Sequence, residues 1–150
     1  MNIEIRCLSG EDIEVFMKLV SVFEKVFDMQ SFMMPPKTHL QTILLKPEFI
    51  VFVAKHNDEV IGGLTAYVLH QYYSEKPVAY LYDLAVKPAF QRQGVGKELV
   101  AALNAHCRER GFQEVFVQAD KADDYAIDFY RKTGTTAEEE VVHFYYALSQ

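Results

Sequence analysis

The chain has 150 residues, half of them hydrophobic, and a formal net charge of −6 at pH 7. This length is usual for one domain, so we expect a single domain over residues 1–150. The negative charge disfavours nucleic acid and an anionic membrane surface as partners, and it suits a small cationic partner. The sequence has no apolar run of 18 residues and opens without the blocks of a signal peptide, so we expect a cytoplasmic protein.

The first half of the chain alternates between strand and helix patterns. Residues 3–8 have the alternation of a strand, and residues 11–27 carry apolar side chains at helical spacing. A second helix is expected to begin near Pro36. Two strand-like runs flank the segment 56–59, which has the composition of a hairpin turn, and residues 76–88 form another long strand.

The second half continues with a helix over residues 91–110 and a strand over 114–120. A short helix follows, which Asp123 or Asp124 is expected to cap. The segment 138–148, EEEVVHFYYAL, has the pattern of a closing strand. The order β-α-α-β-β-β-α-β-α-β, with helices both between and beside strands, predicts an α/β fold with a mixed central sheet flanked by helices.

The two cysteines, Cys7 and Cys107, are far apart and do not have the spacing of metal ligands. In the inferred compartment we expect both to be reduced thiols. The histidines form no metal-ligand pattern either, so no metal is expected. Neither cysteine lies in a segment with a catalytic pattern, which argues against a covalent intermediate.

The segment QRQGVG stands where a strand passes into a helix, and it holds Gly94 and Gly96. Exposed amides at a helix start bind anions, and glycine lets a phosphate approach the backbone. Arg92 and Lys97 add positive charge nearby. The segment lacks the spacing of a dinucleotide fingerprint or a P-loop. It is therefore interpreted as a pyrophosphate site, with tight helix–sheet packing as the alternative.

Three motifs in this order resemble the GNAT superfamily of N-acetyltransferases. QRQGVG matches the Q/R-x-x-G-x-G/A signature, YLYDLAV with the turn after it matches the family's fourth strand, and DFYRKTG matches the closing motif. The resemblance covers nearly the whole chain and implies the GNAT fold. The shorter segments YDLAV, VQAD, DD and VHF are similar to the aminoglycoside 3-N-acetyltransferase group within that superfamily.

The resemblance implies acetyl-CoA as the donor substrate. Main-chain groups of Leu84, Ala85 and Val86 are expected to bind the pantetheine arm where their strand splays from its neighbour. Backbone amides along the turn are expected to hold the pyrophosphate. The residues of this turn are Gln91, Arg92, Gln93, Gly94, Val95 and Gly96.

Acetyl transfer to an amine needs a neutral amine, a donor to the oxyanion and a proton for the leaving thiolate. The resemblance places Tyr130 near the thiol sulfur as the general acid; from the pattern alone it is a tyrosine at the edge of the core. Two carboxylates are candidates for the general base. Asp83 is a charge within an apolar strand, and Asp120 ends the strand that follows.

The acceptor side has weaker signals. Tyr80 and Tyr82 either line the acceptor groove or hydrogen-bond Asp83. Acidic residues attract a polycation, and the candidates for this role are Asp123, Asp124 and Glu140. One of the two aspartates is better explained as a helix cap. His143 is either a proton relay or a packed histidine.

These features together predict an acetyl-CoA-dependent N-acetyltransferase that modifies an aminoglycoside, at the 3 position, by direct attack in a ternary complex. The alternative acceptors are a polyamine, another small amine or a peptide N-terminus. A non-catalytic sensor of acyl-CoA is the alternative from another class of function. By analogy with relatives, a homodimer is expected, with the tyrosine-rich final strand at its interface.

Overall fold

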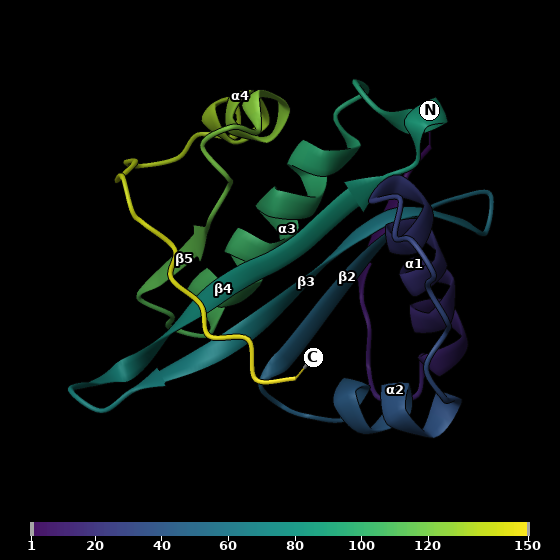
Figure 1. The fold of residues 1–150 in the computed structure, drawn as a ribbon, viewed down its shortest axis with the longest axis horizontal. Coiled ribbons are helices and arrows are strands. Elements are labelled where there is room, and N and C mark those ends of the chain that lie inside the picture. The colour runs from purple at the N-terminus through teal and green to yellow at the C-terminus, as the bar shows by residue number, and fades with distance from the viewer. Residues whose placement is uncertain (1, 150) are drawn as a thin grey trace. The chain divides into compact units, whose positions relative to one another are not determined.

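The computed structural model describes residues 2–149 (Figure 1), and they divide into two compact units, the first ending at Gln118 and the second beginning at Ala119. The two units are described separately, and the single domain expected from length stays a prediction. The first unit contains β1 (Glu4–Cys7), α1 (Ile13–Val26), α2 (Lys37–Leu44), β2 (Phe49–His56), β3 (Glu59–Gln71), β4 (Ser74–Val86), a 3-10 turn (Pro88–Phe90), α3 (Val95–Glu109) and β5 (Glu114–Val117). The second unit contains α4 (Asp124–Arg131).

The sheet has five strands in the order β1-β2-β3-β4-β5, and every neighbouring pair is antiparallel except β4 and β5, which are parallel. This confirms the mixed α/β sheet expected from the sequence. The hairpin between β2 and β3 turns at Asn57 and Asp58, whose φ angles of 49° and 65° are those of a tight hairpin turn. Asn and Asp tolerate this left-handed region better than most residues.

Helices α1 and α3 lie on opposite faces of the sheet (Figure 1). The ring of Phe16 in α1 contacts Phe49 of β2 at 5.8 Å, whereas His106 in α3 contacts Phe52 of the same strand at 5.5 Å. Phe49 and Phe52 are three residues apart in a strand, so their side chains point to opposite faces. The two faces are called the α1 face and the α3 face below.

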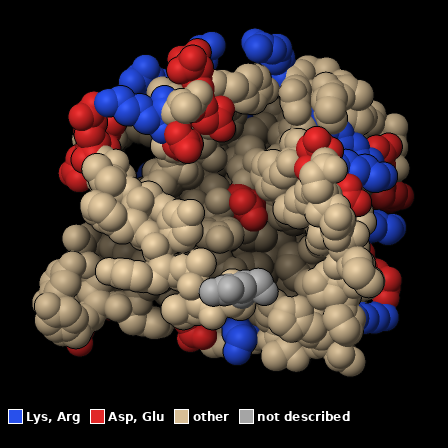
Figure 2. Space-filling view, in the orientation of Figure 1, with Lys and Arg blue, Asp and Glu red and all other residues tan. Residues whose placement is uncertain are grey.

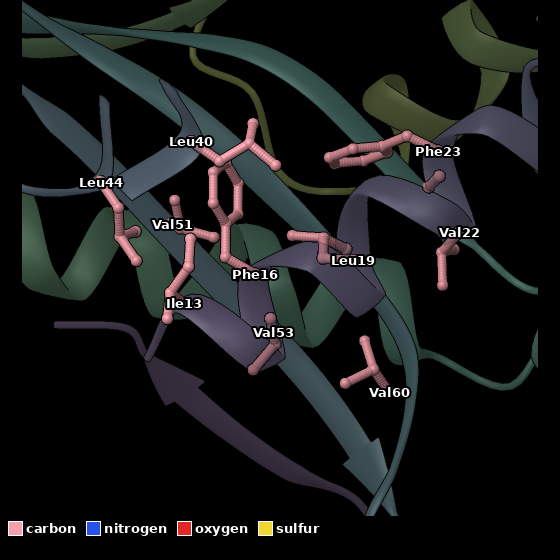
Figure 3. Close-up of a cluster of buried hydrophobic side chains, with 11 residues drawn as sticks. Ile13, Phe16, Leu19, Val22, Phe23, Leu40, Leu44, Val51, Val53 and Val60 are labelled. Carbon is pink, nitrogen blue, oxygen red and sulfur yellow. The ribbon is translucent and has the colours of Figure 1, made fainter. Parts of the chain in front are cut away.

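The core on the α1 face is built from the apolar stripe of α1. Figure 3 shows side chains of α1 and α2 packed against β2 and β3. Leu19 is fully buried at the middle of this cluster. Its Cδ1 atom lies only 2.6 Å from the position of a Cβ at Gly63, so a side chain there would push α1 away from β3. Glycine at this position therefore permits the close packing of helix and sheet.

Helix α3 begins four residues later than the sequence pattern predicts. Val95 is its first residue, and Gly94 before it has φ +86°, in the left-handed region. A left-handed residue cannot continue a helix, so Gly94 is the N-cap and only Gly96 lies in the first turn. Only Gly96 therefore carries the cost of a glycine within a helix, which is about 1 kcal/mol relative to alanine.

The closing strand predicted over residues 138–148 is wrong. The second unit has α4 as its regular element, and its described residues from 137 to 149 form neither helix nor strand. A strand needs a neighbour to satisfy its backbone N–H and C=O groups, and the described part of this unit supplies none. The tail consequently exposes large hydrophobic side chains, which are Val141, Val142, Phe144, Tyr145, Tyr146 and Leu148.

Candidate active site

The turn between β4 and α3 is held in shape by its own side chains. The side-chain amide of Gln91 donates a 2.7 Å hydrogen bond to the carbonyl oxygen of Val86, and that of Gln93 donates to Ala89 at 3.2 Å. Arg92 has φ 61°, an unfavourable value for a residue with a long side chain. Strain of this kind is common where a backbone is shaped for a ligand.

Gly94 leaves an open approach to the start of α3. An ideal Cβ at this position would meet no atom of the described chain within 4 Å. A depression of about 580 Å³ adjoins it. The residues that line this depression are Ile3, Gln93, Gly94, Lys97, Glu98 and Ala101. Amides at a helix N-terminus beside a lysine form a setting that suits an anionic group such as a phosphate.

β4 extends beyond the end of its pairing with β5. The parallel ladder joins Val78 to Glu114 and ends where Leu81 meets Val117, whereas β4 runs on to Val86. Among the described residues, no strand pairs with the last residues of β4 on the side away from β3, and the carbonyl oxygen of Val86 accepts the hydrogen bond of Gln91. The side chains of Ala85 and Val86 are buried, so an approaching arm would meet main chain there, as the sequence motif implies.

A β-bulge interrupts β4 at Tyr82. Leu81 pairs with Ala66 and Asp83 pairs with Thr65, so Tyr82 is the extra residue between two paired positions. The alternation of side chains shifts by one residue at such a bulge. As a result, Tyr82 and Asp83 both lie on the α1 face although they are consecutive in the sequence. Without the bulge, one of them would point to the α3 face.

An aromatic row crosses four strands on the α1 face. Consecutive ring centroids lie 5.2, 5.4, 5.6 and 4.7 Å apart. In spatial order, the row consists of Phe49, Tyr67, Tyr82, Tyr80 and Phe116. Sequence reasoning identified Tyr80 and Tyr82 and missed the other three, because only the strand register places them side by side. Tyr67 pairs with Phe49 on one side and with Tyr80 on the other.

Asp83 lies at this row in a partly desolvated position. Burial raises the pKa of its carboxyl group above the usual range. The pKa of the Tyr67 hydroxyl is also raised, mainly by burial and further by the nearby Tyr82 and Asp83. Figure 2 colours the acidic side chains red and the basic side chains blue, and one red group is surrounded by uncharged residues. A carboxylate with a raised pKa is a better proton acceptor than an exposed one.

The second unit holds the remaining predicted catalytic residues. Tyr130 is half-buried in α4, and its ring contacts that of Phe129 at 4.9 Å. Asp120 is exposed, and its Oδ1 atom accepts a 2.9 Å hydrogen bond from the amide of Ala122. One oxygen of the Asp120 carboxylate therefore stabilises the turn before α4. The roles of Asp120 as general base and of Tyr130 as general acid stay predictions.

The predicted acceptor-binding acids of the second unit differ in their contacts. Asp123 is the N-cap of α4, and its carboxylate accepts a 3.0 Å hydrogen bond from the amide of Ala126, which agrees with the capping interpretation. Asp124 is exposed in the first turn. Glu140 is exposed and pairs with Lys121 at 3.1 Å. His143 is exposed beside Tyr145, with ring centroids 6.1 Å apart, rather than packed in a strand.

Neither a thiol of lowered pKa nor a cluster of metal ligands is found among residues 2–149. Both cysteines are free thiols, and burial raises the pKa of Cys107 to about 11. No group of three or more potential metal ligands occurs in the described chain. No helix there is long and apolar enough to cross a membrane.

A second depression, of about 450 Å³, lies at the other end of α3 and is lined by Cys7, His70 and His106 among others.

Comparison with known proteins assigns this fold and its motifs to a family. Residues 17–135 match the model of the Acetyltransferase (GNAT) family. A curated aminoglycoside N(6')-acetyltransferase type 1 from Stenotrophomonas maltophilia is 32% identical over 113 residues, which are 73% of this chain and 74% of that protein. Crystal structures of the aminoglycoside acetyltransferase meta-AAC0020, from an uncultured soil metagenomic sample, superpose with a TM-score of 0.96.

Those two structures cover 98% of this chain and 97% of theirs, at 56% identity for the complex with trehalose and 55% for the complex with sisomicin. The match thus extends over both compact units, including the segment after residue 135.

Proposed function

Because this chain belongs to the GNAT acetyltransferase family and is an acyltransferase, we propose that it moves the acetyl group of acetyl-CoA to an amine of an aminoglycoside. The observation that carries the proposal is the agreement over nearly the whole chain with aminoglycoside acetyltransferases, together with the glycine-capped turn before α3.

Main-chain groups of the protein bind the donor, acetyl-CoA. The amide of Gln91 donates to the carbonyl oxygen of Pro88, so the amides that follow it, up to Gly96, hold the pyrophosphate. Lys97 adds positive charge at the same helix start. Backbone groups of Leu84 to Val86 bind the pantetheine arm where β4 extends past β5. The donor contributes a thioester, whose carbonyl carbon is the electrophile. Since these contacts need no particular side chain, the required feature is an unobstructed backbone.

The transfer forms an N–C bond and breaks the C–S bond. The amine loses one proton in the process, and the thiolate gains one. Tyr130 donates the proton to the departing thiolate. Asp83 or Asp120 accepts the proton of the amine, directly or through water. The raised pKa of Asp83 favours it as the base, and main-chain N–H groups of β4 beyond the bulge donate to the oxyanion.

An acceptor screen tests the proposal. The full chain is incubated with acetyl-CoA and an aminoglycoside such as sisomicin, spermidine or a short peptide, and both CoA release and product mass are measured. Turnover of the aminoglycoside well above that of spermidine and peptide is expected. Faster turnover of spermidine or of the peptide would instead identify a polyamine or a peptide N-terminus as the acceptor. Binding of acetyl-CoA without turnover of any amine would favour the sensor.

The position of acetylation needs a separate measurement. The sequence motifs predict the 3-amine, while the curated relatives carry names that refer to the 6' position. We retain the 3-amine as the proposal from the motifs. Two-dimensional NMR of the purified product from sisomicin identifies the modified nitrogen directly. A product acetylated on the amine attached to the 6' carbon would correct the motif-based prediction and leave the proposed reaction intact.

The base is identified by comparing Asp83→Asn with Asp120→Asn. The limb of the pH–rate profile that reports ionisation of the base is expected to disappear in Asp83→Asn and to persist in Asp120→Asn. The opposite result assigns the proton to Asp120. Retention of the limb in both variants would indicate another group or a water relay.

We also propose that the protein forms a homodimer through its tail. The exposed hydrophobic side chains of residues 141–148 are more than a single chain usually leaves in water, and their sequence has the pattern of a strand. Sedimentation of the full chain should give the mass of two copies. Replacing Phe144 and Tyr146 with serine is expected to shift it to one copy; a monomeric wild type contradicts this proposal.

A further inference from the structure

The aromatic row and Asp83 differ from a site built for a polycation alone. A polycation needs several carboxylates, whereas the row presents flat, uncharged rings over four strands. Tyr67 is 39% exposed and Tyr82 is 56% exposed, although large aromatic side chains on a sheet face are ordinarily covered. Exposed aromatic groups beside a reactive site usually have a ligand to contact.

The geometry of the row offers both ring faces and ring edges to a ligand. The ring of Tyr82 stands nearly perpendicular to its neighbours, at 87° to Tyr67 and 86° to Tyr80. Tyr80 in turn is stacked parallel on Phe116, at 6°. Tyr80 is held in place by this stack and by a 3.2 Å hydrogen bond from its hydroxyl to Gln118. At the Tyr80 end, the row is therefore held in a fixed position by neighbouring groups.

The row is also continuous with the proposed acetyl-transfer site. The bulge that places Tyr82 on the α1 face places Asp83 beside it, and the splayed end of β4 begins at the same residues. An acceptor whose amine lies near Asp83 consequently has its remaining atoms over the row.

We propose that the aromatic row packs against an uncharged sugar ring of the acceptor, and that the enzyme therefore acetylates amino sugars that carry a single amine. The inference rests on the proposed acetyl transfer. The C–H groups on the flat face of a pyranose ring form an apolar surface that matches an aromatic face. Because the ring supplies the contact, further ammonium groups on the acceptor are not required for recognition.

The test compares glucosamine with ethanolamine, which has the same amino-alcohol unit and no ring. Acetyl transfer to each is measured with the wild type, with Tyr67→Leu, and with Tyr72→Leu as a control. Tyr72 lies at the tip of the β3–β4 hairpin and is 99% exposed. Each acceptor is compared with itself across variants, so the different basicities of the two amines cancel.

The expected result is turnover of glucosamine, with a KM that rises about tenfold in Tyr67→Leu, and a kcat and acetyl-CoA KM that stay close to those of the wild type. Ethanolamine should be a poor acceptor whose kcat/KM is the same in all three proteins. Tyr72→Leu should behave as the wild type with both acceptors.

Three outcomes overturn the inference. The first is turnover of sisomicin without turnover of glucosamine, which leaves the proposed function intact. The second is an equal loss for glucosamine and ethanolamine in Tyr67→Leu, which would show that the row acts on the amine rather than on the ring. The third is a change in sedimentation mass with unchanged KM, which would make the row an interface between chains. Failure of every amine, sisomicin included, would instead remove the proposed function.

Discussion

The donor turn and the acceptor face are built in different ways. The donor turn, residues 87–96, is local: neighbouring residues shape it, through side-chain bonds such as that from Gln91 to Val86, and its key position is one left-handed glycine. The acceptor face draws its side chains from β2, β3, β4 and β5, and a bulge aligns them. We propose that the first region binds its substrate through backbone and the second through side chains, so substitutions should affect the two substrates separately.

The largest expected effect is on turnover, from Tyr130→Phe. Removal of the proposed general acid should lower kcat about 100-fold and leave the affinity for acetyl-CoA unchanged, because the ring itself is retained. Tyr125→Phe is the matched control, since Tyr125 is an exposed tyrosine of the same helix. Stopped-flow or steady-state CoA release measures kcat, and calorimetry measures the affinity. Wild-type turnover in Tyr130→Phe would remove its assigned role.

A second substitution pair tests whether the donor turn binds through its backbone. Gly94 and Gly111 both have positive φ and open space around an added Cβ. Alanine at either position should therefore lower the free energy of unfolding by a similar amount, about 1–2 kcal/mol. Only Gly94→Ala should raise the KM for acetyl-CoA, about tenfold, with the acceptor KM unchanged.

Thermal unfolding and donor titration of the two glycine variants give these values. Equal acetyl-CoA KM values in Gly94→Ala and Gly111→Ala would show that the turn does not contact the donor. A change in the acceptor KM of Gly94→Ala would contradict the separation of the two regions.

The raised pKa of Asp83 predicts how stability depends on pH at the acceptor face. A carboxyl group whose pKa is higher in the folded chain favours folding at low pH, and this contribution is lost as pH rises through the folded pKa. Asp83→Asn should consequently be more stable than the wild type at pH 7. The difference should vanish below about pH 3.9, the ordinary value for Asp.

Denaturant unfolding of Asp83→Asn and wild type across this pH range provides the measurement. Glu139→Gln is the control, as an exposed carboxylate of the tail. A variant that is less stable than the wild type at neutral pH would indicate that the carboxylate of Asp83 has a stabilising partner.

The smallest expected effect comes from Tyr80→Phe. This change removes the hydroxyl that bonds Gln118 and keeps the ring stacked on Phe116. Since the bond is exposed, we expect a loss of less than about 1 kcal/mol of stability and an acceptor KM close to that of the wild type. Tyr73→Phe, which removes a comparable hydroxyl bond to Gln71, is the control. A large rise in acceptor KM would show that the hydroxyl, not the ring, binds the acceptor.

Local patterns in the sequence were sufficient for the first five strands, the four helices and the motif-bearing turn. Alternation identified β2 and β3, helical spacing identified α1, and QRQGVG marked the donor turn, because each of these signals depends on near neighbours in the chain. Their exact starts were less accurate. The beginning of α3 was wrong by four residues because a left-handed N-cap depends on backbone geometry that composition does not specify.

Only the tertiary structure decided how the acceptor face is composed. Phe49, Tyr67 and Phe116 join Tyr80 and Tyr82 because of strand register, and Asp83 shares their face because one extra residue in β4 shifts the alternation. The tail shows the same dependence on distant residues. Residues 138–148 have the pattern of a strand, but a strand forms only beside a neighbouring strand, and the sequence of the segment does not specify whether one is present. Local preference belongs to a residue and its neighbours, whereas pairing belongs to two distant segments.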